Sequence, residues 1–262
     1  QDDAHIFCTP DQVYGEVAAF CELTQQTYRD FGFHEVIIKL STKPEVRLGS
    51  DEIWDRGEQA LADALNRIGV KWELNPGQGA FYGPKIEYNV RDCLGRMWQL
   101  GTIQIDYNMP ERLGAKYIGE DNQPHTPVML HRAICGSLER FVGILIEQYA
   151  GAFPLWLAPV QAVVASVSEK SAAYANSVRD RLAAAGLRVE ADNTAEKIGP
   201  KKHAARKQKV PYILVVGEQE AAAGTVNVND RAGRTLGTEE VEAFIARCRQ
   251  EIETKAIDPA GA

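Results

Sequence analysis

Two histidines and an arginine lie in segments whose patterns could bring them to one site. His5 falls in a short strand-like stretch at the start of the chain, and His131 lies in the apolar run 127–134. After a glycine-serine break, a helix pattern begins with Arg140 near its start. A helix start after a strand is suited to hold a phosphate or a carboxylate, and an arginine there can fork onto phosphate oxygens or stack on a base. A core histidine and a surface arginine are the alternative interpretation.

Histidine and cysteine together raise the question of a zinc site. Zinc takes neutral imidazoles and thiolates as ligands, and it keeps one position open where it binds substrate. The residues alone allow a four-ligand site made by His5, Cys8, His131 and Cys135. They also allow two satisfied core imidazoles with buried cysteines, because a free cysteine is among the most buried residue types.

The composition is that of an ordinary soluble globular protein. The chain has 262 residues, of which 45% are hydrophobic and 25% charged, and this suits one large or two medium domains. A net charge of −7 does not indicate a nucleic-acid partner, so any basic surface must be local. Five sparsely spaced cysteines favour a reducing compartment over a disulfide framework. The sequence has no run of about 18 apolar residues, so no membrane span is expected.

Helix and strand patterns alternate in the first part of the chain. A capping box predicts a helix from Thr9 to Gly32, and an apolar run predicts a strand over 36–40. A second helix is expected from Ser50, which can serve as its N-cap, to Gly69.

Two strands follow, over 86–90 and 97–107, and they predict an antiparallel hairpin inside a larger sheet. Gln99 and Gln104 lie five residues apart, so a regular strand would point their side chains to opposite faces. Gly101 lies between them and is a candidate for a β-bulge, which would change this alternation.

Pro154 and Pro159 end the preceding helix and mark a domain junction. Beyond the junction, strand and helix patterns alternate as in a compact α/β domain. Strands are predicted over 160–167, 187–191, 212–216 and 225–228, and helices over 171–185, 198–208 and 239–253.

Several motifs occur in an order that carries a family resemblance. They occupy residues 1–8, 80–86, 98–107, 117–121 and 130–140. This ordered set resembles the catalytic domain of threonyl-tRNA synthetases, which are class II aminoacyl-tRNA synthetases. The part of the chain after Pro159 resembles the anticodon-binding domain of the same family. The resemblance implies an α+β catalytic domain built on a class II antiparallel sheet over residues 1–157, followed by a smaller α/β anticodon-binding domain over 158–262.

The same resemblance implies an activity and its partners. The chain would catalyse ATP-dependent activation of threonine to threonyl-adenylate, with Mg-ATP as substrate, and transfer of the threonyl group to threonine tRNA. A cytoplasmic homodimer with no membrane partner is expected for the intact protein. The first class II motif, which builds the dimer, and the leading arginine of the second motif would precede Gln1. We therefore expect a fragment that starts within the second motif, and a chain that truly began at Gln1 should not form adenylate at a useful rate.

The resemblance also chooses between the zinc alternatives. His5 and His131 match metal ligands of the family, and the third protein ligand is a cysteine upstream of residue 1. Cys8 and Cys135 then become packing residues. A metal that takes the amino group and the hydroxyl of threonine together would reject valine, which lacks the hydroxyl, better than an apolar pocket could. Serine would still enter, and the editing domain that the family uses against it is not visible in this sequence.

The matched motifs assign further roles around threonine. Asp3 matches the residue that accepts a hydrogen bond from the threonine hydroxyl, and Tyr82 matches a contact to the amino group. Gln1, Lys85 and Gln104 are expected near the carboxylate and the reacting centre, where a positive charge would stabilise charge developing at the α-phosphate.

ATP contacts come from the later motifs. Arg140 matches the arginine at the end of the third class II motif, which would stack on adenine or reach the terminal phosphate. Gln99 and Thr102 are expected to contact the ribose and the adenosine. The predicted catalytic groups are Lys85, Gln104 and Arg140.

A basic stretch predicts where the second domain contacts RNA. It comprises Lys197, Lys201, Lys202, Arg206, Lys207 and Lys209. Contact with the tRNA backbone is one interpretation, and a solvated helix face is the other. The resemblance assigns anticodon readout to Lys201, His203 and Glu220. The family pattern places an arginine at His203 and an asparagine at Ala195. These departures are the only support for the alternative of a synthetase paralogue with a binding or regulatory role and no tRNA charging, and the matched residues of the first domain stand against it.

Overall fold

The computed structural model describes residues 1–257, and its core is divided between two units. The first unit is Gln1–Gln148, and the second begins at Tyr149. The domain boundary expected between residues 157 and 158 falls inside the second unit, because Leu155 packs into that unit's buried core. The functional boundary stays a prediction. Among the described residues, no helix combines the length and the apolar character that crossing a membrane requires.

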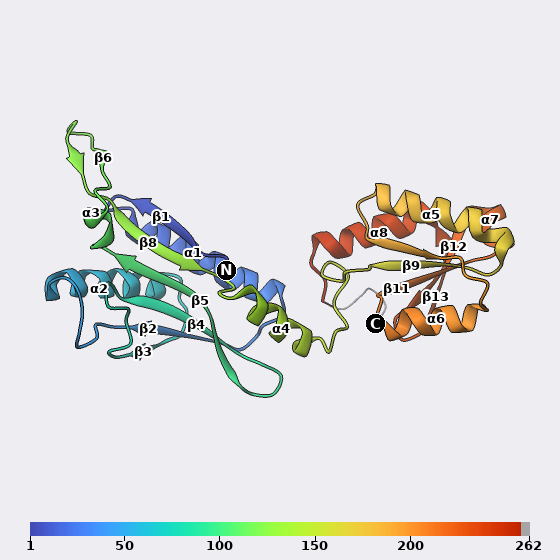
Figure 1. Ribbon diagram of the computed structural model, residues 1–262, viewed down its shortest axis with the longest axis horizontal. Helices are drawn as coiled ribbons and strands as arrows, with labels where there is room; N and C mark the ends of the chain where they lie inside the picture. The colour runs from blue at the N-terminus through green and yellow to red at the C-terminus, as the bar shows by residue number, and fades with distance from the viewer. Residues whose placement is uncertain (258–262) are drawn as a thin grey trace. The chain divides into compact units, whose positions relative to one another are not determined.

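A six-stranded sheet with the strand order β1-β8-β5-β4-β2-β3 forms the centre of the first unit (Figure 1). The strands are β1 (Ala4–Cys8), β2 (Val36–Ser41), β3 (Trp72–Asn75), β4 (Lys85–Arg91), β5 (Met97–Asp106) and β8 (Val128–Ala133). All neighbouring strands run antiparallel except β2 and β3, which are parallel. The predicted α+β fold on an antiparallel sheet is thus confirmed, with one parallel pair at the edge. Strand β3 was not predicted, because four residues are too few to establish a period.

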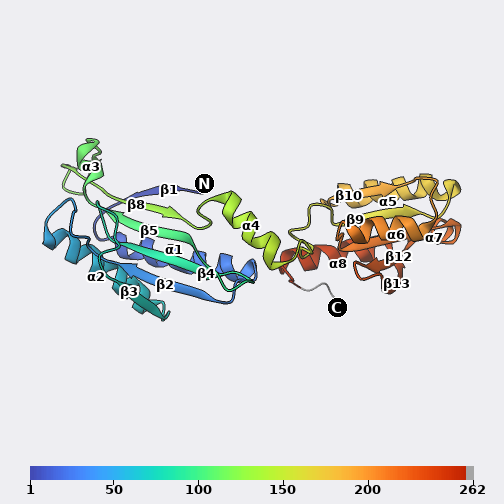
Figure 2. The ribbon, with the colours of Figure 1, turned by 60° about the horizontal axis from the view of Figure 1, so that its bottom comes forward.

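Helices α1 (Val13–Asp30) and α2 (Asp51–Arg67) cover one face of this sheet (Figure 2). Ser50 is the N-cap of α2 as predicted, and its hydroxyl accepts a hydrogen bond from the Ile53 N–H at 3.5 Å. Helix α1 starts later than predicted. The Thr9 hydroxyl donates to the Asp11 carboxylate at 2.6 Å, so residues 10–12 form a turn and Gln12 occupies the N-cap position.

Strand β5 contains the bulge that was predicted at Gly101. It advances three residues from Gln99 to Thr102 while β4 advances two from Asn89 to Glu87. Because of the extra residue, the side chains of Gln99 and Thr102 lie on the same face of the sheet, whereas a regular strand would point them to opposite faces. Accordingly, the Gln99 amide donates to the Thr102 hydroxyl at 3.2 Å.

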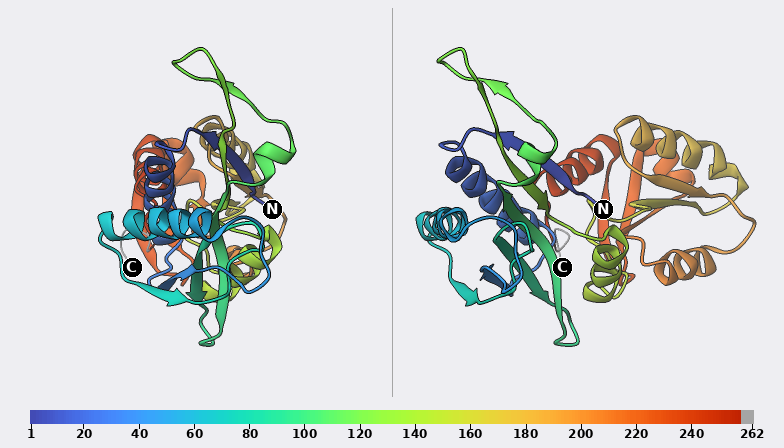
Figure 3. Two further views of the ribbon diagram at one scale, coloured as in Figure 1. Left: turned by 90° about the vertical axis from the view of Figure 1, so that its left-hand side faces the viewer. Right: turned by 60° about the vertical axis from the view of Figure 1, so that its left-hand side comes forward.

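Short elements complete the first unit after β5. They are α3 (Met109–Arg112), β6 (Tyr117–Ile118), β7 (Pro124–His125) and α4 (Leu138–Gln148). Strands β6 and β7 form a hairpin that projects from the sheet, drawn in light green in Figure 3. Helix α4 follows β8 and begins at the predicted place, so Arg140 lies in its first turn.

The second unit is built on a five-stranded sheet with the order β10-β9-β11-β12-β13. Its strands are β9 (Ala162–Ser166), β10 (Val189–Asp192), β11 (Tyr212–Val216), β12 (Thr225–Asp230) and β13 (Thr235–Glu240). Its helices are η1 (Glu169–Ser171), α5 (Ala172–Ala184), α6 (Ile198–Lys207), α7 (Glu218–Ala223) and α8 (Val241–Glu253). The predicted α/β domain is confirmed, and the elements that were not predicted are the short helix η1, the short α7 and the mostly exposed edge strand β13.

Candidate active site

A pocket of about 240 Å³ opens on the first sheet where β1, β5 and β8 lie side by side. Its lining includes the predicted residues Gln1, Asp3, His5, Tyr82, Thr102, Gln104 and His131. Strand register explains this convergence. His131 of β8 lies directly opposite His5 of β1 on one side and opposite Gln104 of β5 on the other. Side chains of directly opposed residues share a face of the sheet.

The two histidine rings meet edge to face, with their centroids 4.8 Å apart. Nε2 of His131 lies 3.0 Å from Oδ2 of Asp106, a buried carboxylate at the end of β5. The other oxygen of Asp106 accepts from the Asn108 and Met109 N–H groups at 2.8 and 2.9 Å. Burial alone would raise the pKa of Asp106, but these bonds and the contact with His131 hold it below its usual value. The carboxylate therefore stays ionised and engages Nε2, which leaves Nδ1 of His131 for another ligand.

The residues present fit part of a zinc site. A metal-binding histidine usually bonds through its other nitrogen to a carboxylate, as His131 does with Asp106. Within residues 1–257, no group of three or more His, Cys, Asp or Glu side chains is placed to share one ion. His5 and His131 therefore need a further ligand. Burial raises the pKa of the Cys8 and Cys135 thiols to about 11.

Tyr82 reaches the pocket from the loop between β3 and β4. Its hydroxyl donates to the Gln104 side chain, and burial raises the pKa of this phenol. Two hydrogen bonds hold the loop. The Asn108 amide donates to the Tyr82 carbonyl at 3.0 Å, and the Leu48 N–H donates to the Phe81 carbonyl at 2.7 Å.

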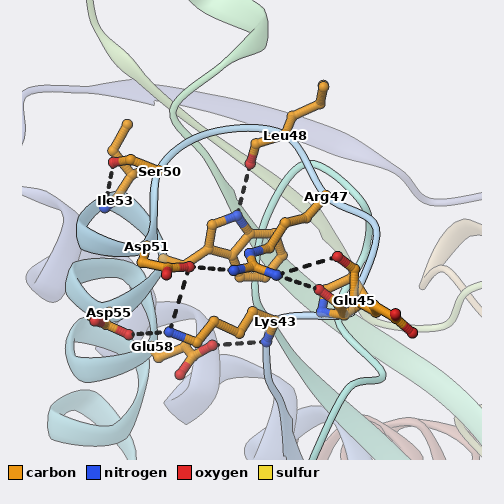
Figure 4. A network of polar contacts seen from close by, with 11 residues as sticks. Lys43, Glu45, Arg47, Leu48, Ser50, Asp51, Ile53, Asp55 and Glu58 are labelled. Carbon is orange, nitrogen blue, oxygen red and sulfur yellow. Dashed lines mark hydrogen bonds and ion pairs between the residues drawn. The ribbon is translucent and has the colours of Figure 1, made fainter.

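The segment around Leu48 is itself held by a polar network at the start of α2 (Figure 4). The Trp54 indole N–H donates to the Leu48 carbonyl at 2.7 Å. Arg47 pairs with Asp51, and Lys43 pairs with Asp55 at 2.7 Å. The N-terminal turns of α2 thus support the loop that carries Tyr82.

Lys85 lies beside the pocket. It is directly opposite Gln104 in the β4–β5 pairing, and Glu87 is opposite Thr102. The Lys85 ammonium and the Glu87 carboxylate form an ion pair at 2.5 Å, and both side chains are largely buried. The lysine is therefore held on the face of the sheet that carries Gln104.

Arg140 is anchored where β5 begins. Its guanidinium donates to the Gln99 carbonyl at 3.2 Å and lies 5.6 Å from the centre of the Trp98 ring. The Trp98 indole N–H donates to the buried Asp92 carboxylate at 2.8 Å. Roles for Trp98 and Asp92 were not predicted, although an aromatic residue next to Gln99 in a predicted strand was a usable signal.

The predicted anticodon residues lie on different elements of the second unit. His203 is exposed on α6, and the Glu220 carboxylate accepts from the Gly217 N–H at 2.8 Å at the start of α7. Lys201 requires a correction, because its side chain is buried and not at a surface that faces RNA. Its ammonium donates to the carbonyls of Ser166 and Asp192 at 2.8 and 3.1 Å and so links β9 to β10. Helical spacing turns Lys201 inward, next to the buried Ala205 on the same face of α6.

Two family models match this chain. Residues 1–149 match the tRNA synthetase class II core domain (G, H, P, S and T), and residues 161–251 match the anticodon binding domain. The chain therefore belongs to the class II tRNA synthetases, with an anticodon-binding domain after the core.

Three individual proteins that are similar to this chain share one amino-acid specificity within the class. A threonine–tRNA ligase of Alkalilimnicola ehrlichii is 58% identical over 252 residues, which are 96% of this chain and 39% of that protein. One from an Azoarcus species is 58% identical over 256 residues, or 98% and 40% of the two chains. A solved structure described as the RNA binding domain of threonyl-tRNA synthetase from Cryptosporidium parvum superimposes with a TM-score of 0.88 at 40% identity, covering 95% of this chain and 63% of that one. The chain thus spans about 40% of the length of its ligase relatives.

Proposed function

We propose that the intact protein is a threonine–tRNA ligase. The observation that carries the proposal is the pocket in which Asp3, His5, Tyr82, Gln104 and His131 converge on one face of the sheet. The similarity to threonine–tRNA ligases supports the same assignment.

One side of the pocket suits threonine. Asp3 offers a carboxylate to the threonine hydroxyl, and the Tyr82–Gln104 pair offers polar atoms to the amino and carboxylate groups. His5 and His131, together with a cysteine upstream of residue 1, would hold zinc, which supplies a Lewis acid for the amino group and the hydroxyl. Valine would leave these polar groups unpaired, and an unpaired buried polar group costs more than a missing apolar contact.

The other side suits ATP. In the first step, a threonine carboxylate oxygen attacks the α-phosphorus, and the bond to pyrophosphate breaks. Lys85 and Arg140 supply positive charge for the phosphates, and Gln99 and Thr102 supply polar contacts to the ribose and adenosine. Mg-ATP is the substrate that this arrangement requires.

Transfer to tRNA completes the reaction. A ribose hydroxyl at the 3′ end of the tRNA attacks the carbonyl carbon of the adenylate, and AMP leaves. The second unit would bind the anticodon stem-loop of threonine tRNA with His203 and Glu220 near the bases. We place the intact protein in the cytoplasm as a homodimer, on the family resemblance.

The test is threonine-dependent ATP–pyrophosphate exchange by the intact protein. Exchange should be fastest with threonine, weaker with serine and marginal with valine. His131→Ala should abolish exchange and change the melting temperature little, whereas His125→Ala, which alters an exposed histidine of β7, should keep full activity. Equal exchange with valine, or full exchange in His131→Ala, would contradict the proposal.

A further inference from the structure

We propose that Tyr28 and Asp2, neither of which lines the described pocket, are positioning residues that join the two halves of the site. The threonine half is Asp3, His5, Tyr82 and His131, and the nucleotide half is Gln99, Thr102 and Arg140. This inference rests on the proposed function for the names of the two halves.

The hydroxyl of Tyr28 lies between β5 and β8 where their pairing stops. The last paired residues are Thr102 and Ala133, and the next residues along the two strands are Gly101 and Ile134. Here the Gly101 N–H donates to the Tyr28 oxygen at 2.8 Å, and the Tyr28 hydroxyl donates to the Ile134 carbonyl at 2.7 Å. A side chain of α1 therefore replaces the direct bond between the strands and lets them diverge.

On β5, the Tyr28 hydroxyl provides a hydrogen-bond acceptor at the bulge. A bulge leaves the extra residue outside the ladder, so its N–H needs another acceptor. Tyr28 is that acceptor, and the bulge is what places Gln99 on the face of Thr102. Only glycine fits at position 101, because a Cβ there would lie 2.6 Å from the Tyr28 oxygen and 3.0 Å from the Ile134 carbonyl oxygen.

On β8, Asp2 holds the turn that follows the strand. Its carboxylate accepts from the N–H groups of Ile134, Cys135 and Gly136 at 2.8, 3.1 and 2.9 Å. This turn leads directly into α4, which carries Arg140. Asp2 lies between Gln1 and Asp3 in the chain, and both of those residues line the pocket. The carboxylate thus ties the strand that carries the threonine contacts to the turn that sets the start of α4.

The two contacts act on the same turn from opposite directions. The Asp2 carboxylate accepts hydrogen bonds from the N–H groups of residues 134–136, and the Tyr28 hydroxyl donates to the carbonyl of Ile134. Burial raises the pKa of Tyr28, so its hydroxyl stays protonated and can donate and accept at once. Losing either residue should disturb Gln99 and Arg140, which lie beyond the divergence, more than His5 and His131, which lie on the paired strands.

The test measures exchange kinetics of the intact protein with ATP and threonine varied separately. Tyr28→Phe keeps the ring contacts with Tyr88 and Phe33 and removes only the hydroxyl. We expect the KM for ATP to rise about tenfold, as for a buried hydrogen-bond partner left unpaired, while the KM for threonine changes less than about twofold. Asp2→Asn, which keeps one acceptor oxygen, should give a smaller effect in the same direction than Asp2→Ala.

Tyr88→Phe is the matched control. Its ring lies against Tyr28, but its hydroxyl lies beside Cys21 of α1. It should leave the KM for ATP unchanged. Equal changes in both KM values for Tyr28→Phe, no change in either, or the same split in Tyr88→Phe would overturn the inference.

Hydrogen exchange gives a readout that does not depend on catalysis. The amides of Gly101 and of residues 134–136 should exchange faster in Tyr28→Phe and Asp2→Asn, and they should keep their protection in Tyr88→Phe. A wild type without threonine-dependent exchange activity would refute the proposed function. Unchanged amide protection in both variants would refute the positioning roles, whatever the activity.

Discussion

A single carboxylate sets the orientation of His131. Asp106 receives two backbone N–H groups on one oxygen and faces Nε2 of His131 with the other. The imidazole can then present only Nδ1 to the pocket side of the strand pair. A metal bound at Nδ1 would therefore depend on Asp106 as well as on His131 itself.

Asp106→Asn should lower zinc affinity of the intact protein about 10- to 100-fold, the usual cost of losing a carboxylate behind a metal-binding histidine. The amide oxygen can still accept from Asn108 and Met109, so the amide N–H₂ would face Nε2 of His131. That nitrogen would then accept, and the proton would move to Nδ1, where it blocks the metal. Zinc content after dialysis against a graded chelator series measures the effect.

Asp121→Asn is the control for this prediction. Asp121 contacts Nε2 of His125 at 2.9 Å in an exposed pair of the same chemistry outside the pocket. Its zinc content should equal that of the wild type. An Asp106→Asn protein that retains zinc as strongly as the control would disprove the role of Asp106.

Asp3 should set the preference for a hydroxyl-bearing substrate. Removing it in Asp3→Ala removes part of the penalty that valine meets in a site built around a hydroxyl. We expect threonine exchange to fall and the valine-to-threonine ratio of kcat/KM to rise about tenfold. Asp3→Asn keeps an acceptor oxygen and should stay closer to the wild type. Unchanged ratios in both variants would show that Asp3 does not contact the hydroxyl.

At the scale of elements, the β4–β5 turn is connected to Arg140, which we propose to contact ATP. Asp92 accepts from the Leu94 and Arg96 N–H groups, from the Arg96 guanidinium and from the Trp98 indole. The Trp98 ring in turn lies next to Arg140. A hairpin turn therefore helps to place an arginine that is distant from it in sequence.

This turn should make stability depend on pH in the acid range. Burial raises the pKa of Asp92, but the bonds from Trp98 and Arg96 outweigh it and bring the pKa to about 2. A carboxylate whose pKa is depressed in the folded state stabilises the fold above its unfolded pKa of about 3.9. That stabilisation is lost as the pH falls towards 2.

The measurement compares melting temperatures of the wild type and Asp92→Asn between pH 6 and pH 2. The difference should be constant above about pH 4 and should shrink steadily below it. Asp63→Asn, which changes an exposed carboxylate whose described partner is Gln59 on the same helix, should show little difference at any pH. A gap between wild type and Asp92→Asn that stays constant down to pH 2 would refute the assignment.

At the scale of the whole molecule, each unit has its own sheet, and the matches to the class II core domain and to the anticodon binding domain fall largely in different units. The second unit has exposed basic residues on and after α6, whereas the side chain of Lys201 is buried. Under the proposed function, we expect sequence-independent attraction to RNA from the exposed group and base readout from residues such as His203.

His203→Arg, alone and with Ala195→Asn, should raise charging of threonine tRNA by the intact protein. Arginine offers a permanently charged planar fork where histidine offers a shorter ring, and each base contact regained is worth about 1–3 kcal/mol on the scale known for bidentate contacts to DNA. Charging efficiency with threonine tRNA and with a tRNA of altered anticodon is the measurement. If both tRNAs respond equally, or neither does, other residues read the anticodon.

Local patterns were sufficient for much of this protein. Motif order indicated the family, helical and strand periods located most long elements, and a glycine between two glutamines predicted the β5 bulge. These features depend on residues close together in sequence, and for that reason they can be read without a structure. The predicted residues of the threonine half were also found together, because the family motifs carry them.

The tertiary structure decided which groups hold those residues in place. Tyr28 bonds to a carbonyl 106 residues away and Asp2 to an N–H 132 residues away, and such pairs depend on strand register and helix packing that no local pattern contains. Lys201 was expected at the surface, but the packing of α6 on the sheet turned its side chain inward to two carbonyls. Sequence thus determined which chemical groups the protein carries, whereas only the fold decided which of them reach the pocket and which support it, because burial and long-range hydrogen bonds are properties of the packed chain.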